Sequence, residues 1–197
     1  MKKKKKMKRR LVLASASPRR LDILYSLGLD PAVVVADAVE LTDREPDELV
    51  TLNAEIKAKG VLPLCRGGDI VVAADTVVVC EGELLGKPKD VADARRMLTL
   101  LSGRSHWVYT GVAVFDYSAG NGASGFTKTE VHFAELSPEM IDAYIQTGEP
   151  LDKAGAYGIQ GRGGIFVKSI SGDYGTVVGL SPYLFAILAA KVNFPIF

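Results

Sequence analysis

The residues most suggestive of chemistry lie in one apolar stretch near the middle of the chain. Apolar side chains run from Ile70 to Cys80 and are interrupted only by Asp75 and Thr76. A run so rich in valine predicts a strand that is buried on both faces. A carboxylate in such a strand is costly unless it is hydrogen-bonded, paired or bound to a cation, so Asp75 is a candidate active-site residue. The pattern also allows an aspartate that only caps neighbouring backbone.

A second cluster, close to the start of the chain, has the residue types of an anion site. A short apolar strand over residues 11–14 leads into two serines and two arginines, Ser15, Ser17, Arg19 and Arg20. Ser17 suits a helix N-cap and Pro18 the first helical position, so free backbone amides and two guanidinium groups would converge there. This arrangement favours a phosphate site. The alternative is a capped helix with two solvated arginines.

Strand and helix patterns alternate along the chain and would position these residues. Strands are expected at residues 11–14, 31–38, 69–80, 105–115, 126–136, 165–170 and 176–180. Helices are expected at residues 18–27, 46–59, 90–101 and 138–147, and again from residue 182. A turn at residues 81–83 would fold the chain back and bring Lys87 toward Asp75, and residues 117–125 read as a flexible loop. The order predicts an α/β fold with a mixed sheet and antiparallel hairpins.

Composition restricts the class of protein. The chain has 197 residues, of which 48% are hydrophobic and 24% charged, as in an ordinary globular protein with a substantial core. It has no apolar run near the ~20 residues of a membrane span and no secretory signal pattern. Cys65 and Cys80 have neither metal-ligand nor C-x-x-C spacing, so we expect free thiols in a reducing, cytoplasmic environment.

Charge is unevenly distributed. Residues 1–10 hold eight of the 24 basic residues and no acid, whereas the rest of the chain has 16 basic and 23 acidic residues. We expect residues 1–10 to be a disordered basic tail and residues 11–197 to form a single catalytic domain. The tail has the composition of an electrostatic arm for nucleic acid, but the acidic body argues against nucleic acid as the main partner.

Several familiar sites are missing from the sequence. It contains no G-x-x-x-x-G-K-[ST] loop and no G-x-G-x-x-G after a strand, which argues against P-loop NTPases and dinucleotide oxidoreductases. His106 and Trp107 have no neighbours that complete a metal or triad pattern, so structural roles are expected for them. The glycines of residues 155–164 would let backbone approach a ligand closely.

The motifs together resemble the Maf family. In order, they are L-A-S-A-S-P-R-R, A-D-T, G-K-P, L-S-G-R-S-H and E-P-L-D-K-A-G-A-Y-G-I-Q-G, and the likeness extends from Leu11 to the final helix. The resemblance implies a nucleoside triphosphate pyrophosphatase with a fold similar to inosine-triphosphate pyrophosphatases. Such a fold is an elongated mixed β-sheet with flanking helices and two lobes around a nucleotide cleft. It also implies that two copies can pair as a homodimer.

The resemblance assigns roles to particular residues. The family's general base falls on Asp75, its helix lysine on Lys57 and its hairpin lysine on Lys87. Ser15, Ser17 and Arg20 would bind phosphate. Arg19, Thr76 and Gln160 match the branch that acts on dTTP and UTP, which predicts a pyrimidine nucleoside triphosphate as the substrate.

The resemblance also implies a divalent metal cation, Mg²⁺ or Mn²⁺, held by Asp75 and an acid that follows the second strand. The family usually has two adjacent acids there, with the second near the metal, but this chain has Val39-Glu40-Leu41. Either Glu40 or a later acid such as Asp43 would then take the role.

A competing class remains open on the sequence alone, because the Maf name is also attached to inhibition of septum formation. A nucleotide-binding regulator of cell division with little turnover would share the cleft. The combination of Asp75, Lys57 and Lys87 favours the enzyme, since a pure binder has no need for a carboxylate that activates water.

Overall fold

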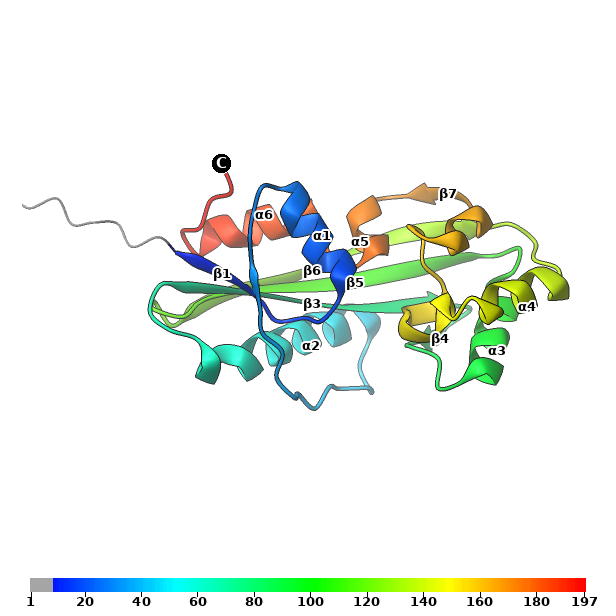
Figure 1. Ribbon diagram of the computed structural model, residues 1–197, viewed down its shortest axis with the longest axis horizontal. Helices are drawn as coiled ribbons and strands as arrows, with labels where there is room; N and C mark the ends of the chain where they lie inside the picture. Colours follow the sequence, from blue (N-terminus) through cyan, green and yellow to red (C-terminus); the bar gives the residue numbers. More distant parts are fainter. Residues whose placement is uncertain (1–8) are drawn as a thin grey trace, which may run out of the picture.

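The chain folds around one mixed β-sheet in an elongated molecule (Figure 1). This computed structural model describes residues 9–197. The strand order is β2-β1-β3-β5-β6-β7, and β4 pairs with β3 beyond the end of β1. Helices flank the sheet, so the expected α/β class with an elongated mixed sheet is confirmed. Among residues 9–197, no helix has the length and apolar content needed to cross a membrane.

The elements follow the capping signals in the sequence. The strands are β1 (Arg10–Leu13), β2 (Ala32–Val33), β3 (Asp69–Cys80), β4 (Glu83–Leu85), β5 (Ser105–Asp116), β6 (Asn121–Phe133) and β7 (Val167–Ser171). The α-helices are α1 (Pro18–Ser26), α2 (Pro46–Val61), α3 (Val91–Leu101), α4 (Pro138–Gln146), α5 (Tyr174–Val178) and α6 (Pro182–Lys191). Four of them begin with proline, whose fixed φ suits the first helical position.

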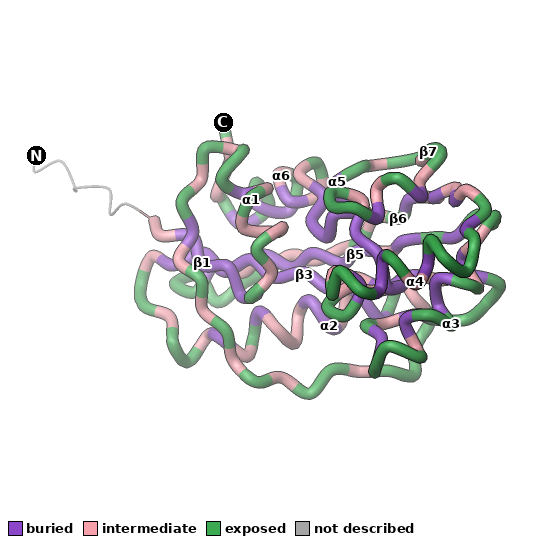
Figure 2. The backbone as a smooth tube through the Cα atoms, turned by 45° about the vertical axis from the view of Figure 1, so that its right-hand side comes forward, coloured by how far each residue is buried: buried purple, intermediate pink, exposed green. Residues whose placement is uncertain are grey.

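Alternate side chains of β3 enter apolar clusters on opposite faces of the sheet. Val72 packs in a cluster with side chains of α1 and α6, whereas Val71 packs with side chains of α2. The strand is buried along almost its whole length (Figure 2). Because side chains alternate along a strand, Asp75 faces α2 and Thr76 faces the side of α1.

One edge of β3 is open in the middle of the strand. β1 pairs with its first four residues, through Val72, and β4 pairs with it from Val78 onward. Residues 73–77 between them pair with β5 alone. Both faces of β3 can be reached at this gap. The side chains of Asp75 and Thr76 point to opposite faces of the sheet, yet both can be reached from this gap.

The turn between β3 and β4 is as tight as the sequence predicted. Its two residues, Glu81 and Gly82, have φ values of 50° and 80°. Positive φ at both central positions is the requirement of the hairpin turn that matches the twist of the strands. The turn returns the chain along β3 toward the open edge.

The strand predicted at residues 176–180 is wrong, because this segment belongs largely to α5. The β-branched residues there favour a strand in isolation. The Asp173 side chain instead accepts a hydrogen bond from Gly175 N at 2.8 Å and caps a helical turn. The helix ends at Gly179, whose φ of 120° suits glycine.

Two other boundaries differ from the sequence prediction. The strand expected at residues 31–38 is reduced to β2, because its partner β1 offers only Val12 and Leu13 for pairing. The loop expected at residues 117–125 is shorter, because β6 already pairs at Asn121 with Asp116 of β5. Both differences reflect the length of the neighbouring strand rather than local propensity.

The basic segment enters the fold earlier than predicted. Residues 1–8 of the predicted tail lie outside the described residues, but Arg10 belongs to β1 and Arg9 pairs with Asp116. Arg10 Nε donates to Asp69 Oδ1 at 3.0 Å, and this hydrogen bond lowers the pKa of the buried Asp69 carboxyl. Arg9 and Arg10, which the prediction assigned to the tail, therefore contact the folded part of the chain.

Candidate active site

A cleft of about 710 Å³ opens at the gap in the edge of β3. It lies between the turn that precedes α1, the loop before α2, β4 and the glycine-rich segment that follows α4. Ten of the candidate site residues that the sequence singled out line it, all except the alternative acid Asp43: Ser15, Ser17, Arg19, Arg20, Glu40, Lys57, Asp75, Thr76, Lys87 and Gln160. Segments far apart in the sequence thus meet in one space.

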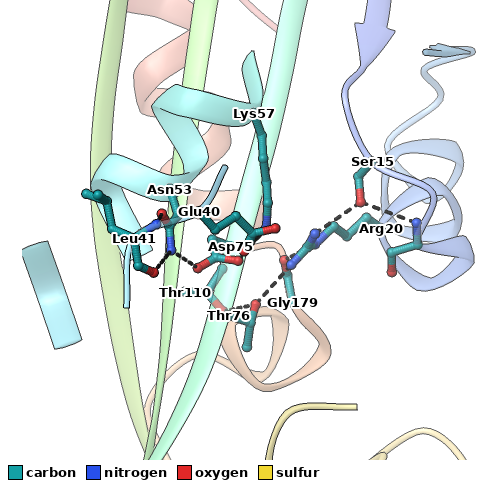
Figure 3. Close-up of polar contacts among 11 residues, drawn as sticks. Ser15, Arg20, Glu40, Leu41, Asn53, Lys57, Asp75, Thr76, Thr110 and Gly179 are labelled. Carbon is teal, nitrogen blue, oxygen red and sulfur yellow. Dashed lines mark hydrogen bonds and ion pairs between the residues drawn. The ribbon is translucent and has the colours of Figure 1, made fainter. Parts of the chain in front are cut away.

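Asp75 lies in this cleft with Lys57 beside it (Figure 3). Lys57 Nζ is 2.6 Å from Asp75 Oδ1 and 3.1 Å from Glu40 Oε2, so one ammonium group bridges two carboxylates. Asp75 is only 7% exposed, whereas the Glu40 side chain is 47% exposed. The hydrogen-bond partners of Asp75 are side chains, so it is not the backbone cap that the sequence pattern also allowed.

Asn53 contacts the other oxygen of the same carboxylate. Asn53 Nδ2 donates to Asp75 Oδ2 at 3.3 Å and to Leu41 O at 3.1 Å, and Asn53 Oδ1 accepts from Leu41 N at 2.8 Å. The residue is 2% exposed. We refer to Asp75, Lys57, Glu40 and Asn53 as the cleft floor.

The helix α2 reaches Asp75 because β5 presents a glycine to it. Gly111 is the partner of Asp75 across the two strands, and a Cβ at Gly111 would lie 2.1 Å from Val50 O of the helix. Asn53 and Lys57 are four residues apart and therefore share one face of α2. Asn53 was not among the predicted site residues, because only its position one turn before Lys57 marks it in the sequence.

Packing accounts for the leucine at the position of the family's second acid. The Leu41 side chain packs against a small apolar cluster of Leu49, Val50 and Val77. Glu40 is then the residue of this pair whose side chain meets Lys57. Asp43, the other candidate acid, lines a shallow hollow beside the cleft, with which it shares Thr42 and Leu84.

Arg20 is fixed on the opposite face of β3. Its Nε donates to Gly179 O at 2.8 Å, its Nη1 to Ser15 Oγ at 3.0 Å and its Nη2 to Thr76 Oγ1 at 3.2 Å. Burial lowers the pKa of the Arg20 guanidinium from its ordinary value, but arginine remains protonated in proteins. Arg20 therefore places a positive charge at a defined point of the cleft.

Thr76 is connected to two further threonines by hydrogen bonds. Thr76 Oγ1 and Thr110 Oγ1 are 2.9 Å apart, and Thr110 Oγ1 donates to Thr176 O at 2.8 Å. The chain of hydrogen bonds connects β3 and β5 to α5, the segment where the sequence had predicted a strand. The Thr76 hydroxyl is thus held in place by Arg20 and Thr110 (Figure 3).

The turn before α1 forms as the sequence predicted, with one difference. Ser17 occupies the N-cap position, but its side chain makes no capping hydrogen bond. Its backbone N–H donates instead to Ser15 Oγ at 3.2 Å. Arg19 Nη1 lies 3.7 Å from Asp152 Oδ2 across the cleft, a loose pair at the surface.

Gln160 projects from a loop that is organised by one carboxylate. Glu149 accepts hydrogen bonds from Arg162 N at 3.0 Å, Gly163 N at 3.2 Å and Tyr144 Oη at 2.9 Å. Burial alone would raise the pKa of the Glu149 carboxyl, but these hydrogen bonds outweigh burial and lower it. We refer to residues 158–163, with the exposed Gln160, as the rim loop.

Positive side chains outnumber negative ones around the cleft. Its lining includes five cationic side chains, Arg19, Arg20, Lys57, Lys87 and Lys153, and three carboxylates, Glu40, Asp75 and Asp152. Lys153 was missed by the sequence analysis, and its Nζ donates to Glu149 O at 2.7 Å. Lys87 is exposed at the edge, and no polar contact within residues 9–197 joins Lys87 or Gln160 to Asp75. The lining suits a polyanionic ligand.

The donor chemistry of the cleft floor fits a cation shared with a phosphate ligand. Asp75 and Glu40 both direct an oxygen at one point, which the Lys57 ammonium occupies. Within residues 9–197, no three His, Cys, Asp or Glu side chains gather into a site that could enclose a metal by themselves. Mg²⁺ is commonly held by one or two carboxylates, waters and substrate phosphates, which this pair can satisfy.

His106 has the structural role that the sequence predicted. It is 1% exposed, its Nε2 lies 2.8 Å from Tyr157 Oη, and its ring packs edge-on against Phe133. Burial lowers the pKa of His106 to about 3, so the ring is neutral at physiological pH. Cys65 and Cys80 are free thiols, as expected.

Comparison with known proteins agrees with the motifs. Residues 10–192 match the sequence model of the family described as Maf-like protein. A protein of Geotalea uraniireducens named dTTP/UTP pyrophosphatase is 48% identical over 88% of this chain and 90% of its own. A protein of the same name from Thermococcus gammatolerans is 52% identical over 86% of this chain and 89% of its own. The solved structure of the Staphylococcus aureus Ham1 protein aligns with 64% of this chain and 73% of its own, at 16% identity and a TM-score of 0.47.

Proposed function

This chain belongs to the Maf-like protein family, and from that premise we propose that it hydrolyses dTTP and UTP to the nucleoside monophosphate and pyrophosphate. Relatives that carry the name of this activity are about half identical over most of both chains. The observation that carries the proposal is the buried Asp75 carboxylate at an otherwise cation-rich cleft. A triphosphate needs such cations, and a hydrolytic water needs such a base.

In the proposed reaction, Asp75 accepts a proton from the attacking water. The water oxygen forms a bond to the α-phosphorus as the bond from that phosphorus to the bridging oxygen breaks, and pyrophosphate leaves. Lys57 on Oδ1 and Asn53 on Oδ2 keep the Asp75 carboxylate in one orientation. Both partners are hydrogen-bond donors, so each oxygen of the carboxylate has a defined neighbour.

The cations serve the phosphates in this proposal. Arg20 presents a fixed guanidinium, and Lys57 and Lys87 come from α2 and from the segment after β4. Ser15 and Ser17 lie at the turn before α1, where backbone amides and the helix dipole favour an anion. Fixed positive charge stabilises both the transferring phosphoryl group and the leaving pyrophosphate.

Arg19, Thr76 and Gln160 would read the pyrimidine base. The Gln160 amide can donate to a carbonyl and accept from an imide N–H, which thymine and uracil offer side by side. Arg20, proposed to bind phosphate, donates a hydrogen bond to Thr76, proposed to contact the base. This hydrogen bond connects the two parts of the proposed nucleotide site. A site built on hydrogen bonds rejects bases that leave its polar groups unpaired.

Asp75 and Glu40 are the residues that would hold Mg²⁺ or Mn²⁺. Such an ion, once bound, would lower the pKa of a bound water and offset charge on the phosphates. Their spacing around the Lys57 ammonium is consistent with this role. Activity should therefore require a divalent cation and disappear in excess chelator, and full activity in chelator would contradict the assignment of Glu40.

A turnover screen of the eight common ribo- and deoxyribonucleoside triphosphates tests the proposal. We expect dTTP and UTP to be hydrolysed fastest, with equal amounts of monophosphate and pyrophosphate. Product analysis is needed because orthophosphate would indicate cleavage at the outer phosphate. Preference for purine nucleotides would overturn the proposed substrate, and binding of nucleotides without turnover would overturn the enzyme in favour of a nucleotide-binding regulator.

A further inference from the structure

A buried amide connects the two segments that carry the carboxylates of the cleft floor. We propose that Asn53 is the positioning residue of this site, which sets Asp75 and Glu40 at a fixed distance from each other. The inference rests on the proposed function in one respect, namely that Asp75 and Glu40 act together on one ligand. Asn53 lines the cleft, but it is 2% exposed and donates to Asp75 and Leu41, so it is not expected to contact the nucleotide.

The contacts of Asn53 are those of a linking residue. Its two donated hydrogen bonds go to different segments, Asp75 Oδ2 on β3 and Leu41 O in the loop before α2. Its carbonyl oxygen accepts from Leu41 N at 2.8 Å. Asn53 is 2% exposed. If its side chain were removed, Asp75 and Leu41 would lose hydrogen bonds that water could not easily replace.

On the strand side, Asn53 fixes the plane of the Asp75 carboxylate. Lys57 contacts one carboxylate oxygen and Asn53 the other. The lysine ammonium is a point charge on a flexible stem, so on its own it restrains the carboxylate poorly. Asn53 is short and buried against the sheet. It therefore provides the fixed reference for the orientation of Asp75.

On the loop side, Asn53 substitutes for secondary structure. The chain from Val34 to Leu41 has no regular secondary structure, yet it must place the Glu40 side chain at Lys57. Both backbone groups of Leu41 are bonded to the single Asn53 amide, and the Leu41 side chain packs beneath the loop. Glu40 is the adjacent residue, so its position follows from this anchor.

A positioning role predicts a distinctive kinetic effect. Displacement of a reacting group by about 1 Å can lower the rate about 100-fold without removing any group from the site. The phosphate and base contacts proposed for Arg20 and Gln160 do not depend on Asn53. Its loss should therefore lower kcat far more than it raises KM.

The test compares two variants of Asn53 with a matched control. Asn53→Leu keeps the approximate size and removes every hydrogen bond, and Asn53→Asp keeps an acceptor for Leu41 N but loses both donors. The control is Thr129→Val, which removes one buried hydrogen bond, 2.9 Å to Asp173 O, away from the cleft. Amide exchange of residues 36–45 and steady-state kinetics are measured on the same full-length preparations.

We expect Asn53→Leu to lower kcat about 100-fold, to change KM less than about threefold and to accelerate amide exchange at Leu41. Asn53→Asp should lower kcat similarly while Leu41 remains partly protected, and it carries the test alone if Asn53→Leu fails to fold. Thr129→Val should keep kcat within about twofold of the wild type. The proposal is overturned if either folded Asn53 variant retains kcat, or if all three variants lose activity in proportion to their loss of stability.

The nucleotide that the wild type hydrolyses fastest is used throughout. If the wild type preferred a purine nucleotide, the proposed substrate would be wrong, but the test of Asn53 could still be made with that nucleotide. The exchange measurement needs no nucleotide at all. Unchanged exchange at Leu41 in Asn53→Leu would overturn the anchoring role, whatever the activity of the enzyme.

Discussion

The cleft floor and the rim loop face the same space but are built in opposite ways. Three of the four floor residues come from β3 and α2, and Asp75 is 7% exposed with a donor on each oxygen. Gln160 is exposed on the rim loop. Glu149 holds the backbone of this loop through the N–H groups of Arg162 and Gly163 and does not hold the Gln160 side chain. On the proposed function, the floor performs the reaction and the rim loop selects the base.

The difference teaches how one site can separate rate from selectivity. Reaction rates depend on distances that rigid elements keep to a fraction of an ångström, which the floor obtains from a buried strand and helix. Selection of a base requires side chains that can vary without disturbing that geometry, and loops provide them. Substitutions in the two regions should therefore change different kinetic quantities.

Asp75→Asn should give the largest loss of activity, and it changes the cleft floor without changing the rim loop. Loss of a general base lowers kcat by about 10²–10⁴-fold, and we expect this in assays of pyrophosphate release from UTP. Asp69→Asn is the matched control, since Asp69 is a buried, ion-paired aspartate at the start of the same strand. The control should lose stability and keep its kcat. Equal losses of activity in both variants would contradict the comparison.

Gln160→Ala should give the next largest effect and bears on the rim loop. Cytosine lacks the imide N–H of uracil, so the wild type should prefer UTP to CTP. Loss of one buried polar pair is worth about 1–3 kcal/mol, or about one to two powers of ten in that preference. The ratio of kcat/KM for UTP to that for CTP should fall toward unity. Gln146→Ala on the exposed end of α4 is the control and should keep the ratio.

Glu149→Gln should give a smaller effect of the same kind. An amide cannot accept from both backbone N–H groups of the rim loop as the carboxylate does. We expect the UTP preference to fall about tenfold or less, because Gln160 is retained but less well placed. Glu135→Gln, an acid-to-amide change at an exposed position away from the cleft, controls for the lost charge. A fall in kcat with an unchanged preference would contradict the role of the rim loop.

His106 gives the smallest expected effect on activity, because it is buried in the core and lines neither region. Its pKa is about 3 in the fold against about 6.5 in an unfolded chain. Below pH 6.5 the unfolded chain binds a proton that the folded protein does not, so stability falls as the pH falls. The free energy of unfolding should drop by about 1.6 kcal/mol between pH 6.5 and pH 5. Denaturation of His106→Gln across this range should show a shallower slope, and an equal slope would contradict the assignment.

Much of this arrangement could be predicted from the sequence because it depends on local signals. Asp75 stands out as a carboxylate in a run of buried valines, and Ser17 and Pro18 mark the start of α1. The turn at Glu81 and Gly82 needs positive φ, which Gly82 adopts without strain. In each case the neighbouring residues in the chain determine the outcome.

Other features depend on contacts that no local pattern contains. The segment predicted as a strand at residues 176–180 is largely helical, and its Thr176 carbonyl accepts a hydrogen bond from the Thr110 hydroxyl of the sheet, 66 residues away in the chain. Asn53 resembles any polar residue of an amphipathic helix until β3 and the Leu41 loop are placed around it. The inward packing of Leu41 likewise depends on Val77, which is distant in the sequence.

The most direct test of the account is the UTP to CTP preference of Asp75→Asn, measured beside that of Gln160→Ala and the wild type. If the floor performs the reaction and the rim loop selects the base, Asp75→Asn lowers kcat/KM for both nucleotides about 10²–10⁴-fold and keeps their ratio. Gln160→Ala then narrows the ratio with much less change in kcat for UTP. A ratio that collapses in Asp75→Asn, or that is unchanged in Gln160→Ala, would contradict the division of roles between the two regions.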